Sequence, residues 1–379
     1  IQLYFNSEYE YRQFKYLWYN ESNLISGGIK YKKNIQLELY EAHIPPLLRF
    51  FHEKNISPSG WISISKNKCK LLNNYEKLTN CLYEIEGSYN DIEALMIDNL
   101  APYKICSFDI EASSSHGDFP LPQKTYKKLA CEIIELSDKK IINNDIFTEI
   151  IHIALLDKSN INLNISKVYI KQSISEDKLK KQIKSILECN IQNIKVETKN
   201  TIENIFKLNN LSDDEDEYSS YKKNNKEINS DVNSIIDFIN NKEIVREVKI
   251  EKLNALLNSN LPDVKGDIVT FIGSTFINYG SKDIYKNHCL VLNDCGKINN
   301  IDNIEIDECK TEKELLLKWR DLILKEDPDI IIGYNIFGFD YEFLYRRAYE
   351  NICVNEFLKM SRIKNEICGK KNKENNYEL

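Results

Sequence analysis

Two carboxylates at the end of one predicted strand are the residues most able to do chemistry. The stretch "YKICSFDIEA" is rich in strand-forming residues, and side chains alternate between the two faces of a strand. Asp109 and Glu111 therefore share a face, roughly 6–7 Å apart at about 3.3 Å per residue. Carboxylates this close repel one another unless a cation lies between them. Such a pair also occurs where a strand end simply reaches solvent, so the rest of the chain must decide.

A third carboxylate follows another predicted strand, in "DPDIIIGYNIFGFDYEFLYRRA". Asp340 comes after a strand at 329–335 and begins a helix predicted over 339–350. It could be only an acid favoured by the helix dipole. However, chemical groups gather at strand ends in α/β sheets, and converging acids can hold two divalent ions about 3.5–4 Å apart. Such a pair orients a water for attack on phosphorus, and carboxylate oxygens suit Mg²⁺ or Mn²⁺.

The elements that must position these acids form an α/β pattern. Further strands are predicted at 267–277 and 285–293. They precede a helix that begins with a capping box at Thr311 and Glu314 and ends at Pro328. The order strand, strand, strand, helix, strand, helix predicts an α/β domain with a mixed sheet, flanking helices and an insertion after its first strand.

Two other regions carry no chemical cluster. Residues 1–100 mix short strands with helices predicted over 45–56 and 88–100. The segment from about 123 to 259 is dense in Lys, Asn, Ile and Glu. We expect a flexible, low-complexity insertion without a core of its own, in which 177–188 and 234–248 form surface helices. Its centre, 211–231, is almost devoid of apolar residues and is predicted to be disordered.

Composition excludes several classes of protein. A length of 379 residues predicts two domains. The net charge of −7, from 58 acidic and 51 basic residues, argues against broad attraction to nucleic acid but not against a local metal-dependent site. No apolar run or signal peptide predicts membrane insertion or secretion. Ten scattered cysteines without a C-x-x-C pair indicate reduced thiols, and the five histidines form no H-E-x-x-H motif.

The acidic motifs resemble a known family. "FDIE" and "DPDIIIGYNIFGFD" are similar to the first two motifs of the 3′→5′ exonuclease domain of family B DNA polymerases, especially the delta type. "YEAHIPPLLRFFHEKNISPSGWISI" resembles the delta-type N-terminal domain, and the long segment after the first motif resembles polymerases of large DNA viruses. The resemblance covers roughly 1–120 and 260–350. It implies a smaller mixed α/β N-terminal domain over 1–100 and a ribonuclease H-like exonuclease domain over 101–379, incomplete at its C-terminus.

The resemblance also implies roles for particular residues. Asp109, Glu111 and Asp340 would be the catalytic ligands of two Mg²⁺ or Mn²⁺ ions. The residues that would bind substrate, by stacking on and positioning the unpaired 3′-terminal nucleotides, are Tyr334, Asn335 and Phe339. The chain would be the N-terminal and proofreading part of a DNA-directed DNA polymerase in DNA replication.

The implied partners are those of a replicative polymerase. They are primer–template DNA with a single-stranded 3′ end, dNTPs in the full-length enzyme, and sliding-clamp or replication accessory proteins, at a nuclear or cytoplasmic viral replication site. The third exonuclease motif and the polymerase motifs are expected beyond Leu379, and the absence of an initiator Met also indicates a fragment. The chain alone is therefore expected to be weakly active.

Two alternative functions remain open at this point. The chain could be a non-catalytic structural module of a replication assembly, although intact acids argue against an idle site. It could also be a stand-alone ribonuclease H-like exonuclease, although the polymerase-like first 100 residues argue against that.

Overall fold

The structure, a computed structural model, describes residues 3–16, 18, 29–42, 44–115, 118–156, 163–194, 234–296, 304–371 and 377–378. The chain divides into two compact units, Ile1–Ala101 and Pro102–Leu379. In the described ranges no helix has the length and apolar character needed to cross a bilayer. The stretch 211–231, predicted to be disordered, lies outside the described residues.

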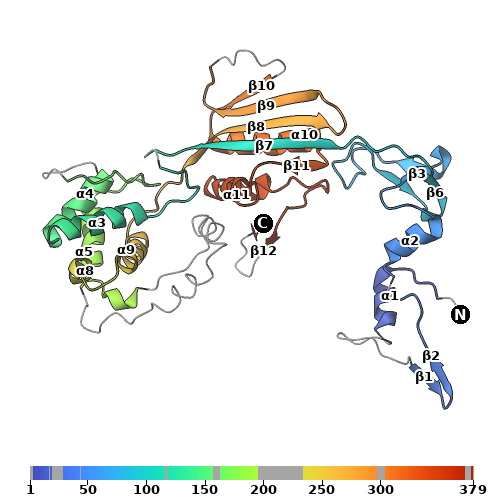
Figure 1. The fold of residues 1–379 in the computed structure, drawn as a ribbon, viewed down its shortest axis with the longest axis horizontal. Coiled ribbons are helices and arrows are strands. Elements are labelled where there is room, and N and C mark those ends of the chain that lie inside the picture. The colour runs from blue at the N-terminus through green and yellow to red at the C-terminus, as the bar shows by residue number, and fades with distance from the viewer. Residues whose placement is uncertain are drawn as a thin grey trace. The chain divides into compact units, whose positions relative to one another are not determined.

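The first unit is built from short elements (Figure 1). Its strands pair antiparallel as β1–β2, β3–β6 and β4–β5. In chain order the elements are α1 (Glu8–Lys15), β1 (Ile29–Lys32), β2 (Ile35–Leu37), α2 (Pro46–Lys54), β3 (Trp61–Ile64), β4 (Cys69–Leu71), β5 (Ile85–Gly87) and β6 (Ile92–Leu95).

The helix predicted over 45–56 is confirmed as α2, which starts at a proline whose fixed φ suits a first helical turn. The helix predicted over 88–100 is wrong. A short 3₁₀ turn, Tyr89–Asp91, leads there into strand β6. Pairing with β3 overrides the local helical preference of this stretch.

The second unit contains a five-stranded mixed sheet in the order β10-β9-β8-β7-β11 (Figure 1). Strands β7, β8 and β9 are antiparallel neighbours, whereas β10 lies parallel to β9 and β11 parallel to β7. The strands are β7 (Lys104–Ser113), β8 (Ile268–Asn278), β9 (Ile284–Leu292), β10 (Ile304–Cys309) and β11 (Ile330–Ile332). The predicted strands and the mixed α/β fold class are confirmed.

Helices cover one face of this sheet and close its core. Trp319 of α10 is fully buried, with its ring centroid 4.8 Å from that of Phe108 on β7. Helix α10 begins as predicted, because the Thr311 hydroxyl accepts a hydrogen bond from the Glu314 N–H at 3.2 Å. The elements are α10 (Glu312–Glu326), α11 (Asp340–Glu350), α12 (Val354–Phe357) and a terminal pair of strands, β12 (Lys370–Lys371) with β13 (Tyr377–Glu378).

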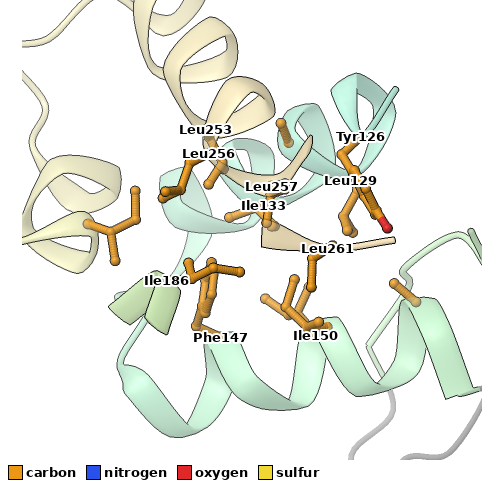
Figure 2. Packing of buried hydrophobic residues seen from close by; sticks show 14 of the residues in the cluster. Tyr126, Leu129, Ile133, Phe147, Ile150, Ile186, Leu253, Leu256, Leu257 and Leu261 are labelled. Atoms are coloured by element: carbon orange, nitrogen blue, oxygen red, sulfur yellow. The ribbon is translucent and has the colours of Figure 1, made fainter. Parts of the chain in front are cut away.

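The long segment between β7 and β8 forms a cluster of helices with its own core (Figures 1 and 2). Its described helices are α3 (Lys127–Lys139), α4 (Asn144–Leu156), α5 (Glu176–Glu188), α8 (Ile235–Asn240) and α9 (Arg246–Asn260). The expectation of an insertion without a core is therefore wrong for the described residues. Leu179, Ile183 and Ile186 of α5 explain the error, since a few apolar residues at helical spacing suffice to bury one face.

The insertion joins the sheet region through a narrow neck, formed by residues 121–122 and 262–267. The Asp267 N–H donates to the Leu121 carbonyl at 2.8 Å, and the Asp267 side chain accepts the Leu121 N–H at 2.8 Å. Lys124 adds an ion pair to Asp267 at 2.7 Å. Leu121 lies in the segment that enters the insertion and Asp267 in the segment that leaves it. Because these two residues exchange two hydrogen bonds, the insertion begins and ends at adjacent positions.

Candidate active site

The two acids of β7 lie on the exposed face of a half-buried strand. Asp109 and Glu111 are exposed, whereas Cys106, Phe108 and Ile110 are buried against the helices. This alternation confirms the prediction that the two carboxylates share a face. The buried residues hold the strand in the core and leave the acids directed away from it.

A bulge interrupts the pairing of β7 and β8 beside Glu111. Glu111 pairs with Phe271, but Ala112 pairs with Val269, so Thr270 is the additional residue of β8. The Thr270 hydroxyl donates to the Glu111 carbonyl at 3.1 Å. Bulges twist a strand and redirect its side chains, and this one lies where the acid-bearing part of β7 ends.

A tight turn after β11 brings the third acid to the same strand. A Cβ at Gly333 would lie 2.8 Å from the Phe108 carbonyl and 2.3 Å from the Ile336 side chain, so only glycine lets the turn pass this close. Asn335 adopts a left-handed φ of 53°, and its carbonyl accepts the N–H groups of Gly338 and Phe339 at 3.0 Å. The chain then enters α11 at Asp340.

Asp340 is a buried carboxyl, 2% exposed. Burial raises its pKa to about 6, and the adjacent Asp109 carboxyl adds to the rise through charge repulsion and a side-chain hydrogen bond. Hydrogen bonds from the backbone of Asp340 and Ile110 act in the opposite direction on this pKa. The buried Oδ1 atom of Asp340 has no hydrogen-bond partner. A buried acceptor without a partner next to a second carboxyl is a position that a cation would stabilise.

The structure thus brings two of the three predicted acids, Asp109 and Asp340, next to one another. It does not add Glu111 to a compact triad, since within the described ranges no three His, Cys, Asp or Glu side chains lie close enough to hold a metal ion. Glu111 lies two residues further along the same exposed face. Its participation in the site stays a prediction.

The predicted substrate-binding residues occupy the turn before α11. Tyr334 is 94% exposed, and the exposed Asn335 side chain folds over Gly338, where a Cβ would meet Oδ1 at 2.4 Å. Phe339 is half-buried, with ring centroids 5.6 Å from Phe119 and 5.3 Å from Phe343. These residues lie beside Asp340 in the chain, and their roles in substrate binding stay predictions.

Sequence reasoning missed two exposed aromatic residues of this region. Phe119 is 61% exposed and lies in the loop after β7, where it contacts Phe339. Phe337 is 86% exposed and packs at 5.5 Å against Tyr341, the second residue of α11. The available signal was the position of these aromatic residues in "GDFP" and "NIFGFD", two loop segments that follow or contain the acidic motifs.

Comparison with known proteins identifies the pattern. The family model "DNA polymerase family B, exonuclease domain" matches residues 37–251 and 247–378. The DNA polymerase of Phaeocystis pouchetii virus is 34% identical over 97% of this chain and 38% of its own length. That of Pyramimonas orientalis virus is 35% identical over 87% of this chain and 26% of its own length.

The similarity to cellular relatives is more local. The DNA polymerase delta catalytic subunit of Arabidopsis thaliana is 38% identical, over 28% of this chain and 9% of its own length. With 97% of the chain matched by the first viral relative, most of the insertion must lie within that match. The chain spans less than two fifths of the length of either viral relative.

Proposed function

Because the chain belongs to the family B DNA polymerases, with their exonuclease domain, we propose that it is the N-terminal and proofreading part of a replicative DNA-directed DNA polymerase. Its reaction is hydrolysis of the last phosphodiester bond of a primer 3′ end, which releases a nucleotide. The observation that carries this proposal is the pair formed by Asp109 and Asp340, in which a buried carboxyl oxygen has no partner.

The family implies the use of divalent metal ions, and the carboxylates of Asp109 and Asp340 suit such ions. The donors are carboxylate oxygens, which hard cations prefer. A bound cation would give the buried Oδ1 of Asp340 the partner that it lacks. Asp109 and Asp340 would hold the first ion, and Glu111 would contribute to a second. We propose Mg²⁺ or Mn²⁺ as the ions.

The chain's own residues prepare the reaction by fixing charge and position. When bound, the ions would activate the attacking water and stabilise the leaving oxygen. The buried helix start holds the Asp340 carboxyl against β7, which limits its motion. The aromatic rings of Phe339 and Phe119, 5.6 Å apart, offer faces on which unpaired bases can stack. Tyr334 and Asn335 lie one turn earlier and would orient the terminal nucleotide.

We assign the two compact units to two functions. Residues 1–100 would form the polymerase N-terminal domain, and 101–379 the exonuclease domain. Template-directed nucleotide addition would belong to the remainder of a full-length enzyme. The substrates would be primer–template DNA with a single-stranded 3′ end and dNTPs, with sliding-clamp or accessory proteins as partners. Viral and delta-type relatives favour a nuclear or cytoplasmic viral replication site.

Substitution of the acid pair tests the proposal in the full-length protein that contains this chain. Asp109→Asn with Asp340→Asn should lower 3′→5′ degradation of single-stranded DNA by about 100-fold or more, since outer partners of metal ligands alone contribute 10–100-fold. Primer extension should stay within about twofold of the unchanged protein, because the polymerase acids lie elsewhere. The single variant Glu111→Gln should likewise reduce degradation and leave primer extension unchanged.

Glu308→Gln is the matched control, because this exposed acid lies on β10, the strand at the far edge of the sheet from β11. It should leave both activities unchanged. Equal loss of degradation and extension in a folded acid-pair variant would contradict the assignment. Retention of degradation would contradict it too, and would place the catalytic residues elsewhere, whereas absence of degradation in the unchanged protein would favour the structural-module alternative.

A further inference from the structure

A buried ion pair joins the two helices that cover the sheet. Arg347 of α11 is 4% exposed and Glu312, the first residue of α10, is 7% exposed. Arg347 Nε donates to Glu312 Oε1 at 2.8 Å, and Nη2 donates to Oε2 at 2.6 Å. This two-bond geometry fixes the relative position of both side chains more strictly than a single contact would.

The same carboxylate also holds the strand pair that carries the acids. Glu312 Oε1 accepts the Val269 N–H at 2.8 Å. Val269 pairs with Ala112, the residue directly after Glu111 at the bulge. Glu312 therefore fixes the position of β8 at the point where β8 pairs with the acid-bearing end of β7.

The arginine is aligned with the third acid on one helix. Arg347 follows Asp340 by seven residues, close to two turns at 3.6 residues per turn, so the two lie on the same face of α11. Both are buried. Phe339, the residue before the helix, makes no side-chain capping bond. The axial position of α11, and with it that of the Asp340 carboxyl, depends on packing and on the Arg347 pair.

The neck of the insertion ends on the same group. Arg347 Nη1 donates to the Pro122 carbonyl at 3.1 Å and pairs with Glu350 at 3.2 Å. Glu350 Oε1 accepts the Gly266 N–H at 3.3 Å. A Cβ at Gly266 would lie 1.9 Å from the Pro122 carbonyl oxygen, so both chains of the neck press against this arginine.

From these contacts we propose that Arg347, with Glu312 as its partner, is a positioning residue of the exonuclease site, and that it couples the helical insertion to the site. This one buried ion pair fixes the positions of three parts of the structure. They are α11, which carries Asp340, the β7–β8 pair, which carries Asp109 and Glu111, and the neck. The proposal rests on the proposed function, because it concerns how the same acids are aligned.

The experiment uses the full-length protein with Arg347→Met combined with Glu312→Gln. Removing both charges avoids leaving either member of the pair buried and unpaired, which would destabilise the fold, and the amide still accepts the Val269 N–H. Glu350 keeps its ion pair with Lys171 at 3.4 Å. The control is Arg346→Met, which removes the neighbouring arginine of α11 and its partly exposed pair with Glu342. Arg347→Lys, which keeps the charge but not the fork, is the conservative variant.

Calorimetric titration with Mn²⁺ should show that the dissociation constant for Mn²⁺ is raised about 10-fold or more in the double variant. The kcat for degrading single-stranded DNA should fall about 10- to 100-fold, since misplacement by about 1 Å has effects of this size. The KM for DNA and primer extension should stay within about twofold, because neither depends on the acids. Arg347→Lys should lie between the double variant and the unchanged protein, and Arg346→Met should match the latter.

Hydrogen exchange gives a readout that does not need activity. The Ile110 amide, which bonds to Asp340, and the neck amides of Asp267 and Gly266 should exchange faster in the double variant. Unchanged Mn²⁺ affinity, kcat and exchange in a folded double variant would overturn the positioning role. Absence of exonuclease activity in the unchanged protein would overturn the proposed function instead, while exchange at Ile110 and the neck would still decide the coupling.

Discussion

The sheet region and the helical insertion keep their apolar residues in two separate cores, and the cores differ in what else they bury. Among described residues, the sheet region buries Ser274, His288, Glu312, Asp340 and Arg347. In the described helices of the insertion, Lys249 is the one buried polar residue, and Asp267 belongs to the neck. Charge is stabilised in a protein interior only by specific partners. The contrast shows that most of the buried polar groups, Asp340 among them, lie in the sheet region, whereas the insertion is held together mainly by aliphatic packing.

Truncation of one aromatic residue in each core gives the largest expected effect. Phe147→Ala in the insertion and Phe343→Ala in the sheet region both empty fully buried positions, and each should lower the free energy of unfolding by about 3–5 kcal/mol. Hydrogen exchange should accelerate in α3, α4, α5 and α9 for Phe147→Ala, and in β7, β8 and α11 for Phe343→Ala. Identical exchange patterns for both variants would show that the two cores unfold as one.

The second largest expected effect is a pH dependence of stability that arises in the sheet region, from Asp340, and not in the insertion. The pKa of Asp340 is raised from 3.8 to about 6, so the folded protein holds this proton where the unfolded chain has lost it. Stability from this group is therefore full below pH 4 and falls as pH rises toward 6, by up to about 3 kcal/mol. Denaturant unfolding without divalent ions should show this slope in the unchanged protein.

Asp340→Asn should remove that difference between pH 4 and pH 7, whereas Asp237→Asn in the insertion should leave it in place. Added Mn²⁺ should restore stability at pH 7 only where Asp340 is retained, because a bound cation favours the ionised carboxyl. A slope that persists in Asp340→Asn would assign the pH dependence to other groups.

The neck gives the smallest of these effects, and it tests how far the two regions are independent. Gly266→Ala would force a methyl group against the Pro122 carbonyl and should cost about 1–3 kcal/mol, seen as a lower melting temperature. Gly296→Ala is the control, since its added methyl group would meet nothing within 4 Å. An unchanged melting temperature in Gly266→Ala would show that the neck deforms easily, and it would count against the proposed coupling through Arg347.

The site could be predicted from the sequence to the extent that its parts are local. The alternation of β7, the glycine turn after β11 and the helix start at Asp340 follow from short-range rules. The exposed Phe119 was missed because its place beside the candidate site depends on its contact with Phe339, which lies far along the chain. The insertion was misjudged because polar composition conceals a few aliphatic residues at helical spacing, whose burial depends on five helices meeting.

The sequence by itself determined which residues could bind a cation, on which elements they lie and which family they belong to. Each of these depends on residue types and on their spacing within short motifs. Only the tertiary structure decided that Asp340 meets Asp109, that its carboxyl is buried with a raised pKa, and that Arg347 ties α10, α11 and the neck together. Desolvation and long-range pairing depend on what packs around a group, and no local pattern specifies that environment.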